Sequence, residues 1–237
     1  MLLISDVSKK YKNGKFANQN ISLQIEDGEI YGFIGPNGAG KSTLIKSIVG
    51  LHKFDSGKIK LDNLTLKDNE LEFKQRIAYI PDNPDLYESL TGIGYLNFVA
   101  DIFGISKDER SNLIDKYASR LEIKDDLANS IKNYSHGMKQ KLALISAFIH
   151  KPKLLVLDEP FVGLDPKASF ELKEIMKEFV SNGSIIFFSS HVLEVVEKLC
   201  DHIGIINQGK VIFDGDFASV KANKSLEEFF LESTENE

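Results

Sequence analysis

A glycine-rich segment that ends in a lysine and a serine is the part of this sequence most suited to chemistry. Residues 35–42 read Gly-Pro-Asn-Gly-Ala-Gly-Lys-Ser and fit the pattern G-x-x-x-x-G-K-[ST] of a phosphate-binding loop. Glycines let backbone N–H groups approach phosphates, and a helix that begins near Gly40 directs its positive end at them. Lys41 adds a charge for the terminal phosphates, and the Ser42 hydroxyl can ligate Mg²⁺. An ordinary glycine-rich turn is the alternative, but the strand before it and the helix after it favour the phosphate loop.

A pair of acids follows an apolar run at residues 154–157 and forms a second candidate site. In a parallel sheet, ligands bind beyond the carboxyl ends of the strands. We therefore expect Asp158 to hold Mg²⁺ through water, and Glu159 to polarise the attacking water as a general base. Two solvated acids at a strand end are the alternative. Read together with the phosphate loop, the pair predicts an ATPase or a GTPase.

Strands and helices alternate around these residues, and this pattern has to position them. Apolar runs with strand character precede both the loop and the acid pair, and helical spacing follows the loop. Such alternation favours an α/β fold with a largely parallel sheet covered by helices. Strands are expected at 2–8, 21–26, 29–34, 57–61, 76–80, 153–157, 184–189, 202–207 and 210–213, and helices at 41–50, 93–103, 107–121, 137–150, 166–180 and 192–200.

Composition restricts the partners and the compartment. The net charge is −6, so no basic footprint for nucleic acid is visible over the 237 residues, and no nucleic-acid partner is expected. The single cysteine, Cys200, lies in an apolar run and is expected to be a buried thiol, which suits a reducing compartment. Because no apolar stretch approaches the ~18 residues that a membrane span needs, we expect a cytoplasmic chain.

Four further segments resemble motifs of the ABC ATPases. Residues 134–140, Tyr-Ser-His-Gly-Met-Lys-Gln, resemble the signature motif, and residues 163–166, Gly-Leu-Asp-Pro, resemble the D-loop. His191 resembles the switch histidine, and Tyr11 resembles the aromatic residue that stacks on adenine. The order and spacing match over nearly the whole chain, which is therefore identified as an ABC transporter ATP-binding subunit. Residues 79–92 and the short C-terminal end point to the exporter type.

The resemblance implies a fold and a domain organisation. It implies one ABC ATPase domain over residues 1–237, with a P-loop NTPase core of the RecA-like kind, an N-terminal antiparallel β subdomain and an inserted α-helical subdomain. The expected division is residues 1–90 and 151–215 for the catalytic core with the β subdomain, 91–150 for the helical signature subdomain, and 216–237 for a C-terminal helix and acidic tail.

The resemblance also implies a mechanism in which two subunits pack head to tail with ATP between them. One subunit would contribute the phosphate loop, and the other would contribute Ser135 and the N–H group of Gly137. Lys41, Glu159 and His191 are then the catalytic residues. The implied Mg²⁺ ligands are Ser42, Asp158 and Asp82, and the implied nucleotide contacts are Tyr11, Gly35, Pro36, Asn37, Gly38, Ala39, Gly40, Lys41, Ser42, Thr43, Ser135 and Gly137.

The implied partners are a polytopic permease subunit and a second copy of the chain or a related ATP-binding subunit. The chain would then lie on the inner face of the cell membrane, bound through the permease. A soluble ABC ATPase of translation or DNA repair is the alternative, but such proteins usually carry two of these domains or a long coiled-coil insertion. A non-catalytic binding module is a third possibility, and the presence of Lys41, Glu159 and His191 disfavours it.

Two residues depart from the family pattern. Asp82 stands where the family usually has a glutamine that senses Mg²⁺, and its shorter, anionic side chain could keep a metal role or only cap a turn. His136 stands where the signature motif commonly has glycine, and it could sense pH or simply be tolerated there.

Two other features keep alternatives open. Tyr11 could be a packed aromatic at a strand end instead of a stacking partner for adenine. Tyr87, Leu90 and residues 93–98 fall where the family's helical subdomain meets the membrane partner, but as apolar residues they could equally belong to the core.

Overall fold

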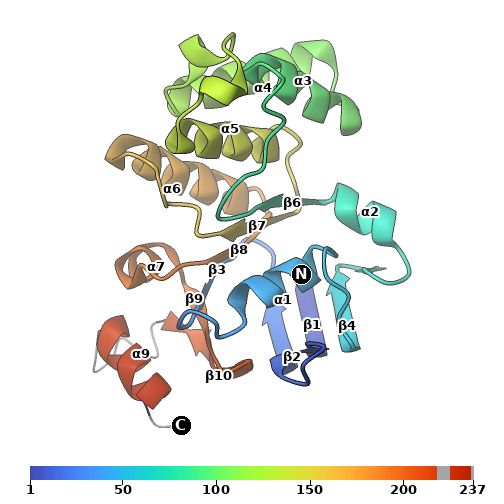
Figure 1. Ribbon diagram of the computed structural model, residues 1–237, viewed down its shortest axis with the longest axis vertical. Helices are drawn as coiled ribbons and strands as arrows, with labels where there is room; N and C mark the ends of the chain where they lie inside the picture. Colours follow the sequence, from blue (N-terminus) through green and yellow to red (C-terminus); the bar gives the residue numbers. More distant parts are fainter. Residues whose placement is uncertain (218–224, 236–237) are drawn as a thin grey trace.

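Two β-sheets stacked with helices form the protein (Figure 1), and the computed structural model describes residues 1–217 and 225–235. A four-stranded antiparallel sheet has the order β2-β1-β4-β5. A six-stranded sheet has the order β10-β9-β3-β8-β7-β6, and all its strand pairs are parallel except β10 with β9. The strands are β1 (Leu2–Lys10), β2 (Phe16–Ile25), β3 (Ile30–Ile34), β4 (Ser56–Leu61), β5 (Leu64–Thr65), β6 (Ile77–Ile80), β7 (Leu154–Asp158), β8 (Ile185–Ser189), β9 (His202–Asn207) and β10 (Lys210–Asp216).

Helices follow most strands of the six-stranded sheet, as the alternating pattern predicts. Their bounds are α1 (Lys41–Ile48), α2 (Glu70–Gln75), α3 (Gly92–Ile102), α4 (Lys107–Arg120), α5 (His136–Phe148), α6 (Pro166–Ser181), α7 (Leu193–Leu199) and α9 (Leu226–Glu235), with short 3₁₀ turns η1 (Lys124–Asp126) and η2 (Ile131–Asn133). The predicted α/β fold with a mainly parallel sheet is confirmed.

The sequence patterns missed two elements, β5 and α2. The helix α2 has six residues, of which only Phe73 is buried, so it shows too little helical periodicity to be recognised. The helix expected within residues 216–237 is found at α9. Residues 218–224 and the last two residues of the expected acidic tail lie outside the described part of the chain.

Two apolar cores lie on opposite faces of the six-stranded sheet. One core fills the space between the two sheets and encloses α1, with Leu44 and Ile48 fully buried. The other core joins the sheet to α5, α6 and α7 and continues into α3 and α4, which lie furthest from the sheet (Figure 1). The strands β7 and β8 are buried at every position, as expected for parallel strands covered on both faces. Cys200 is 5% exposed and belongs to the second core, as predicted.

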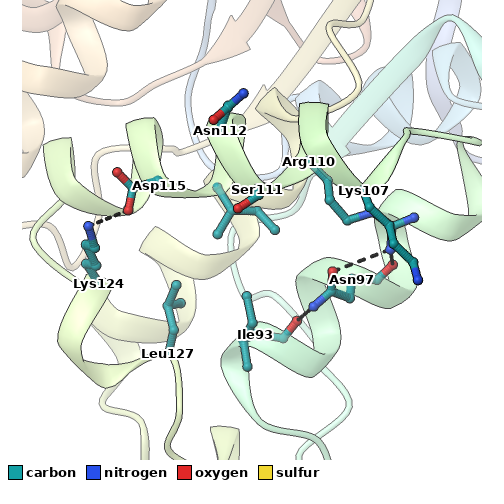
Figure 2. A pocket seen from close by; sticks show the side chains of 10 residues that line it. Ile93, Asn97, Lys107, Arg110, Ser111, Asn112, Asp115, Lys124 and Leu127 are labelled. Atoms are coloured by element: carbon teal, nitrogen blue, oxygen red, sulfur yellow. Dashed lines mark hydrogen bonds and ion pairs between the residues drawn. The ribbon is translucent and has the colours of Figure 1, made fainter.

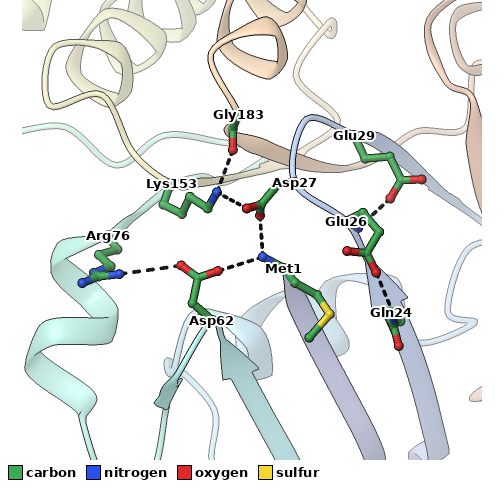
Figure 3. Close-up of polar contacts among 9 residues, drawn as sticks. All are labelled: Met1, Gln24, Glu26, Asp27, Glu29, Asp62, Arg76, Lys153 and Gly183. Carbon is green, nitrogen blue, oxygen red and sulfur yellow. Dashed lines mark hydrogen bonds and ion pairs between the residues drawn. The ribbon is translucent and has the colours of Figure 1, made fainter.

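Ion pairs connect the two sheets near the starts of β1, β3 and β7 (Figure 3). The Lys153 Nζ lies 2.7 Å from Asp27 Oδ2 and donates to the carbonyl oxygen of Gly183 at 2.7 Å. The hydrogen bond from Lys153 lowers the pKa of the Asp27 carboxyl group. The amino group of Met1 contacts both Asp27 and Asp62. These contacts fix the start of β1 against the loops that precede β3 and β7.

Among residues 1–217 and 225–235, no helix combines the length and the apolar character that crossing a membrane would require.

Candidate functional site

The glycine-rich loop lies between β3 and α1, as predicted, and the fold accepts no larger residue at two of its positions. A Cβ atom built on Gly35 would lie 2.3 Å from the carbonyl oxygen of Ile206 in β9. Gly40 has a φ of +116°, and a Cβ there would lie 2.3 Å from the carbonyl oxygen of Ala17 in β2. The loop is therefore pressed between strands of both sheets, and glycine is required by contact as well as by backbone angle.

The turn between β9 and β10 is hydrogen-bonded to the glycine-rich loop and to β2. The N–H group of Gly209 donates to the carbonyl oxygen of Ala39 at 2.8 Å, and the N–H group of Gln19 donates to the Gly209 carbonyl oxygen at 2.7 Å. The Asn18 side chain donates to the carbonyl oxygen of Gly40 at 3.1 Å. These bonds engage the carbonyl groups of Ala39 and Gly40 and attach the loop to β2 and to the turn between β9 and β10.

The ammonium group of Lys41 is folded back onto the loop. Its Nζ donates to the carbonyl oxygens of Gly35 at 2.6 Å and Pro36 at 3.2 Å, and the residue is only 8% exposed. Burial lowers the pKa of Lys41, while the charges of Glu159 and Asp158 oppose this shift. A buried cation beside free helix N–H groups favours an anionic ligand.

One cavity of about 380 Å³ collects most of the predicted site residues. Its volume is in the range of small-molecule sites, and it opens over the amino-terminal end of α1. Its lining residues are Tyr11, Lys15, Phe16, Ala17, Asn37, Gly38, Gly40, Lys41, Ser42, Thr43, Asp82, Asp158 and Glu159. Strand ends separated by more than a hundred residues in the chain therefore meet at one place.

The remaining loop residues lie close by. Pro36 and Ala39 line a neighbouring cavity of about 420 Å³ together with the Gln208-Gly209 turn. Gly35 packs against β9 and lines neither of these two cavities. The sequence analysis missed Lys15, Phe16 and Ala17, which reach the cavity because the turn after Tyr11 reverses the chain into β2. Phe16 is 39% exposed, and an exposed aromatic ring beside a phosphate loop was the available signal.

Tyr11 lies beside the start of α1 and is 46% exposed. Its hydroxyl group and the Thr43 Oγ1 are 2.8 Å apart, so the two hydroxyls share a hydrogen bond. This bond fixes the orientation of a ring whose face remains largely open.

The acid pair lies at the end of β7, opposite Lys41. Asp158 is 5% exposed, and its Oδ1 accepts a hydrogen bond from the Ser189 hydroxyl at 2.5 Å. Carboxylate and hydroxyl oxygens are the donors that Mg²⁺ prefers, so Asp158 and Ser42 fit this ion. Mg²⁺ in nucleotide sites usually combines one or two carboxylates with substrate phosphates. The described residues contain no group of three or more acidic, histidine or cysteine side chains that could hold a metal ion.

Glu159 has a left-handed backbone, with a φ of +52°, which is uncommon for a residue other than glycine. Its N–H group donates to the carbonyl oxygen and the hydroxyl of Ser189 at 3.2 and 3.3 Å. His191 Nδ1 lies 2.9 Å from the Glu159 Oε2, and the His191 N–H donates to the same oxygen at 3.3 Å. The structure thus joins two predicted catalytic residues, and the carboxylate of Glu159 is held from one side.

Asp82 is exposed and lies on the wall of the cavity, near Asp158. Both acids influence Tyr79, whose pKa is raised to about 12 by burial and then by the charges of Asp158 and Asp82. This arrangement agrees with either sequence interpretation of Asp82, because its position reaches the cavity without a direct contact to Asp158.

The signature residues lie apart from this cavity. Ser135 is the N-cap of α5, and its exposed hydroxyl accepts a hydrogen bond from the Met138 N–H at 3.3 Å. Neither Ser135 nor Gly137 lines the cavity around Lys41. The described chain therefore brings together the phosphate loop, the acids, Tyr11 and His191, and leaves the signature residues on another part of its surface.

A larger cavity, of about 790 Å³, lies between α3 and α4 (Figure 2). Two of its lining cations have partners: Arg110 contacts Asn97 and Asp101, and Lys124 contacts Asp115. None of the predicted catalytic or nucleotide-binding residues lines it, so its size does not make it the nucleotide site.

Comparisons with known proteins agree with this geometry. The family model described as ABC transporter matches residues 18–162. An uncharacterized ABC transporter ATP-binding protein of Nostoc sp. is 37% identical over 223 residues, which cover 91% of this chain and 66% of that protein. The chain thus spans about two thirds of the length of that relative. The lantibiotic transport ATP-binding protein SrtF of Streptococcus pyogenes is 36% identical over 230 residues, covering 97% of this chain and 96% of SrtF. A solved structure titled "Structure of ATP binding subunit of ABC transporter" has a TM-score of 0.94 and 33% identity, and the match covers 98% of this chain and 99% of that one.

Proposed function

The chain belongs to the ABC transporter ATP-binding family, and from this membership we propose that it binds and hydrolyses ATP in a site shared by two subunits and thereby powers a permease. The observation that carries the proposal is the division of the predicted residues. One cavity contains the phosphate loop, the acids and Tyr11, and the signature residues lie outside it.

Binding of the nucleotide rests on the residues around α1. The backbone N–H groups of residues 38–43 and the ammonium group of Lys41 bind the phosphates, which replace the two carbonyl oxygens that Lys41 now contacts. The hydroxyl of Thr43 and the open ring face of Tyr11 lie at the other end of the cavity, where the base stacks on the ring. Phe16 lies close enough to form a second wall for the base.

Magnesium would be held by the Ser42 hydroxyl and, through water, by Asp158, with Asp82 facing the same space. When bound, the ion neutralises charge that develops on the phosphate oxygens. The Ser189 hydroxyl keeps the Asp158 carboxylate in one orientation, which preorganises this acid before the substrate arrives.

Glu159 acts as the general base. It takes a proton from the water that attacks the terminal phosphorus, while the bond from that phosphorus to the leaving oxygen of ADP breaks. His191 holds one carboxylate oxygen of Glu159 through its ring and its backbone N–H, which leaves the other oxygen for the water. Lys41 stabilises the negative charge on the transferred phosphoryl group.

The second half of the site comes from another subunit, packed head to tail. Its Ser135 hydroxyl, the Gly137 N–H and the positive end of α5 bind the terminal phosphate from the side opposite Lys41. In the single chain Ser135 is exposed and Gly137 is half-buried, and neither lines the cavity around Lys41, so the proposed site is complete only between two chains.

The permease would bind near α3. Tyr87 and Phe98 are 59% and 43% exposed, and their rings meet edge to face at 5.6 Å, with Tyr95 also beside Tyr87. Exposed aromatic clusters are common in protein interfaces. The proposal therefore places the chain on the inner face of the cell membrane, bound through the permease. We propose export as the direction, from the resemblance of residues 79–92 to the exporter type.

The domain division follows the same logic. We propose that residues 1–90 and 151–215 act as the catalytic core and that residues 91–150, which contain α3, α4 and α5, act as the helical unit carrying the signature. The C-terminal part, residues 216–237, contributes α9, which packs on the core through Phe229 and Phe213 at 5.0 Å.

The substitution Glu159→Gln tests the hydrolytic role. We expect ATP binding to remain, the rate of hydrolysis to fall by about 1,000-fold and the protein to accumulate as a dimer in ATP. Phosphate release and sizing chromatography measure the two effects. Glu174→Gln, at an exposed ion pair on α6, is the control and should behave as the unchanged protein. Hydrolysis at the unchanged rate in Glu159→Gln would show that Glu159 is not the base.

Purification from membranes separates transport from the alternative of a soluble ABC ATPase. A complex with a polytopic membrane protein that persists only in detergent supports transport. Association with ribosomes or DNA instead would refute it.

A further inference from the structure

His136, the residue that departs from the signature motif, covers a glycine of the D-loop in the same chain. A Cβ built on Gly163 would lie 2.5 Å from the His136 Cδ2 and 3.1 Å from its Nε2. A Cβ built on Gly137 would lie 2.5 Å from the Gly163 carbonyl oxygen. The start of α5 and the loop at Gly163 are therefore in direct contact, through one imidazole ring and two glycines.

Two more side chains near the start of α5 contact the loop at residues 160–165. Gln140 is fully buried, and its Nε2 donates to the carbonyl oxygen of Pro160 at 3.3 Å. The Lys141 Nζ lies 2.7 Å from Asp165 Oδ2, and this contact lowers the pKa of the Asp165 carboxyl group. Gln140, four positions after His136, lies on the same face of α5, and Lys141 adds a contact from the next position. The first two turns of α5 therefore hold residues 160–165 along their length.

The loop between these contacts begins at Glu159. Its turns are closed by two hydrogen bonds, from the Val162 N–H to the Glu159 carbonyl oxygen at 3.2 Å and from the Leu164 N–H to the Phe161 carbonyl oxygen at 3.3 Å. A short and internally bonded segment thus links the carboxylate that contacts His191 to the ring of His136. Because the segment is short and hydrogen-bonded to itself, we expect a displacement of one end to be transmitted to the other.

We propose that His136 is a positioning residue whose ring, seated on Gly163, makes the signature segment and Glu159 move as one unit. The inference rests on the proposed function, because it gives a role to the chain's two half-sites relative to each other. When Ser135 and Gly137 engage the nucleotide of a second subunit, the contact on Gly163 carries that change to Glu159 of the same chain. Occupation of one composite site then sets the geometry of the base in the other.

The inference predicts a separation of binding from turnover. In His136→Ala we expect kcat to fall about tenfold, because small displacements of reacting groups have large effects on rate. The dissociation constant for ATP, measured with the monomer, should stay within about twofold, since His136 does not line the nucleotide cavity. His136→Gln keeps a flat side chain of similar length that does not titrate, and it should retain kcat within about twofold from pH 6.5 to 8.5. Asn133→Ala, an exposed position three residues earlier, is the control.

A double-mutant cycle tests the contact itself. Gly163→Ala should lower kcat by about tenfold in the unchanged protein, because the new Cβ meets the ring of His136 and the φ of +79° is strained for alanine. In His136→Ala the same substitution should lower kcat by only about threefold, since the ring is gone and only the strain remains. Thermal unfolding of each variant, measured in parallel, identifies any that fail to fold.

Additive effects of the two substitutions, or a His136→Ala enzyme with unchanged kcat, would overturn the inference. So would a His136→Gln enzyme as slow as His136→Ala. The Glu159→Gln variant distinguishes this failure from failure of the proposed function. If Glu159→Gln still accumulates as an ATP-bound dimer while His136 proves silent, the shared site stands and the coupling through Gly163 does not.

Discussion

The phosphate loop and the signature segment are both helix beginnings, and they differ in how the first turn is satisfied. At α1 the N-cap residue, Gly40, has no side chain to bond the free N–H groups, and the start of the helix is buried beneath a cavity. At α5 the N-cap residue, Ser135, bonds the Met138 N–H with its own hydroxyl and remains exposed. The arrangement at α1 leaves the first backbone N–H groups of the helix free to bind a ligand in the cavity. The arrangement at α5 is stable without a ligand and open to a surface.

The same contrast holds for the neighbouring charges. Lys41 lies close to Asp158 and Glu159, so the cavity contains the cation together with the proposed metal ligand and the proposed base. The signature segment contacts the D-loop of its own chain through His136 and Gly137, and its Lys139 pairs with Glu88. We therefore predict that one half-site binds nucleotide alone, while the other acts on a nucleotide held by another chain. The following predictions test this asymmetry.

Ser135→Arg should have the largest effect, because it should separate ATP binding by the monomer from dimerisation and hydrolysis. We expect ATP binding by the monomer to be unchanged, and both ATP-dependent dimerisation and hydrolysis to fall by about 100-fold, because a bulky cation replaces a phosphate donor. The control is Ser106→Arg at the start of α4, where Ser106 caps the Glu109 N–H at the same distance, 3.3 Å. Both variants lose a cap, at a cost of about 1 kcal/mol in stability, but only one should lose hydrolysis. Unchanged dimerisation of Ser135→Arg would refute the head-to-tail arrangement.

Tyr11→Ala should weaken ATP binding by the monomer, which Ser135→Arg leaves unchanged, because Tyr11 lines the cavity around the phosphate loop. Loss of stacking should raise the dissociation constant of ATP by about tenfold. Tyr11→Phe keeps the ring and loses only the bond to Thr43, so its dissociation constant should rise by about threefold or less. Titration of the monomer with a fluorescent ATP analogue measures both. A lower Tm for Tyr11→Ala with unchanged affinity would mean that the ring only packs at the strand end.

Asp82→Asn should have the smallest effect. Removing an exposed charge near the metal ligand changes the binding free energy by about 1 kcal/mol, so half-maximal activity should require about fivefold more Mg²⁺. Asp85→Asn, three residues later and also exposed, should leave the Mg²⁺ dependence unchanged. Equal Mg²⁺ dependence in all three proteins would leave Asp82 only its role in the turn.

The sequence predicted the phosphate loop and the acid pair more completely than the contacts that join distant segments around them. The phosphate loop is a local motif, because its glycines, Lys41 and Ser42 act through one turn and one helix, so eight consecutive residues carry the information. The strand ending in Asp158 and Glu159 was predictable for the same reason. The direct contact of His191 with Glu159 was not, since it depends on the register of β7 beside β8.

Contacts between distant segments account for the rest of what the sequence left open. Phe16 and Lys15 reach the cavity because of how β2 turns back beside the loop, which no local pattern encodes. The ring of His136 meets Gly163 only because α5 packs across residues 160–165. In the sequence these residues are 27 positions apart, and the histidine appeared only as a departure from a motif.

A disulfide between the two halves tests the central claim most directly. Asn37, exposed on the phosphate loop, and Ser135, exposed at the signature, would both be replaced in a Glu159→Gln background as Asn37→Cys and Ser135→Cys. The native thiol, Cys200, is buried and should not compete. The account predicts that mild oxidation in ATP joins two chains through these positions, and that neither single variant nor the ADP-bound protein forms this product. A disulfide that forms within one chain, or equally well without ATP, would contradict it.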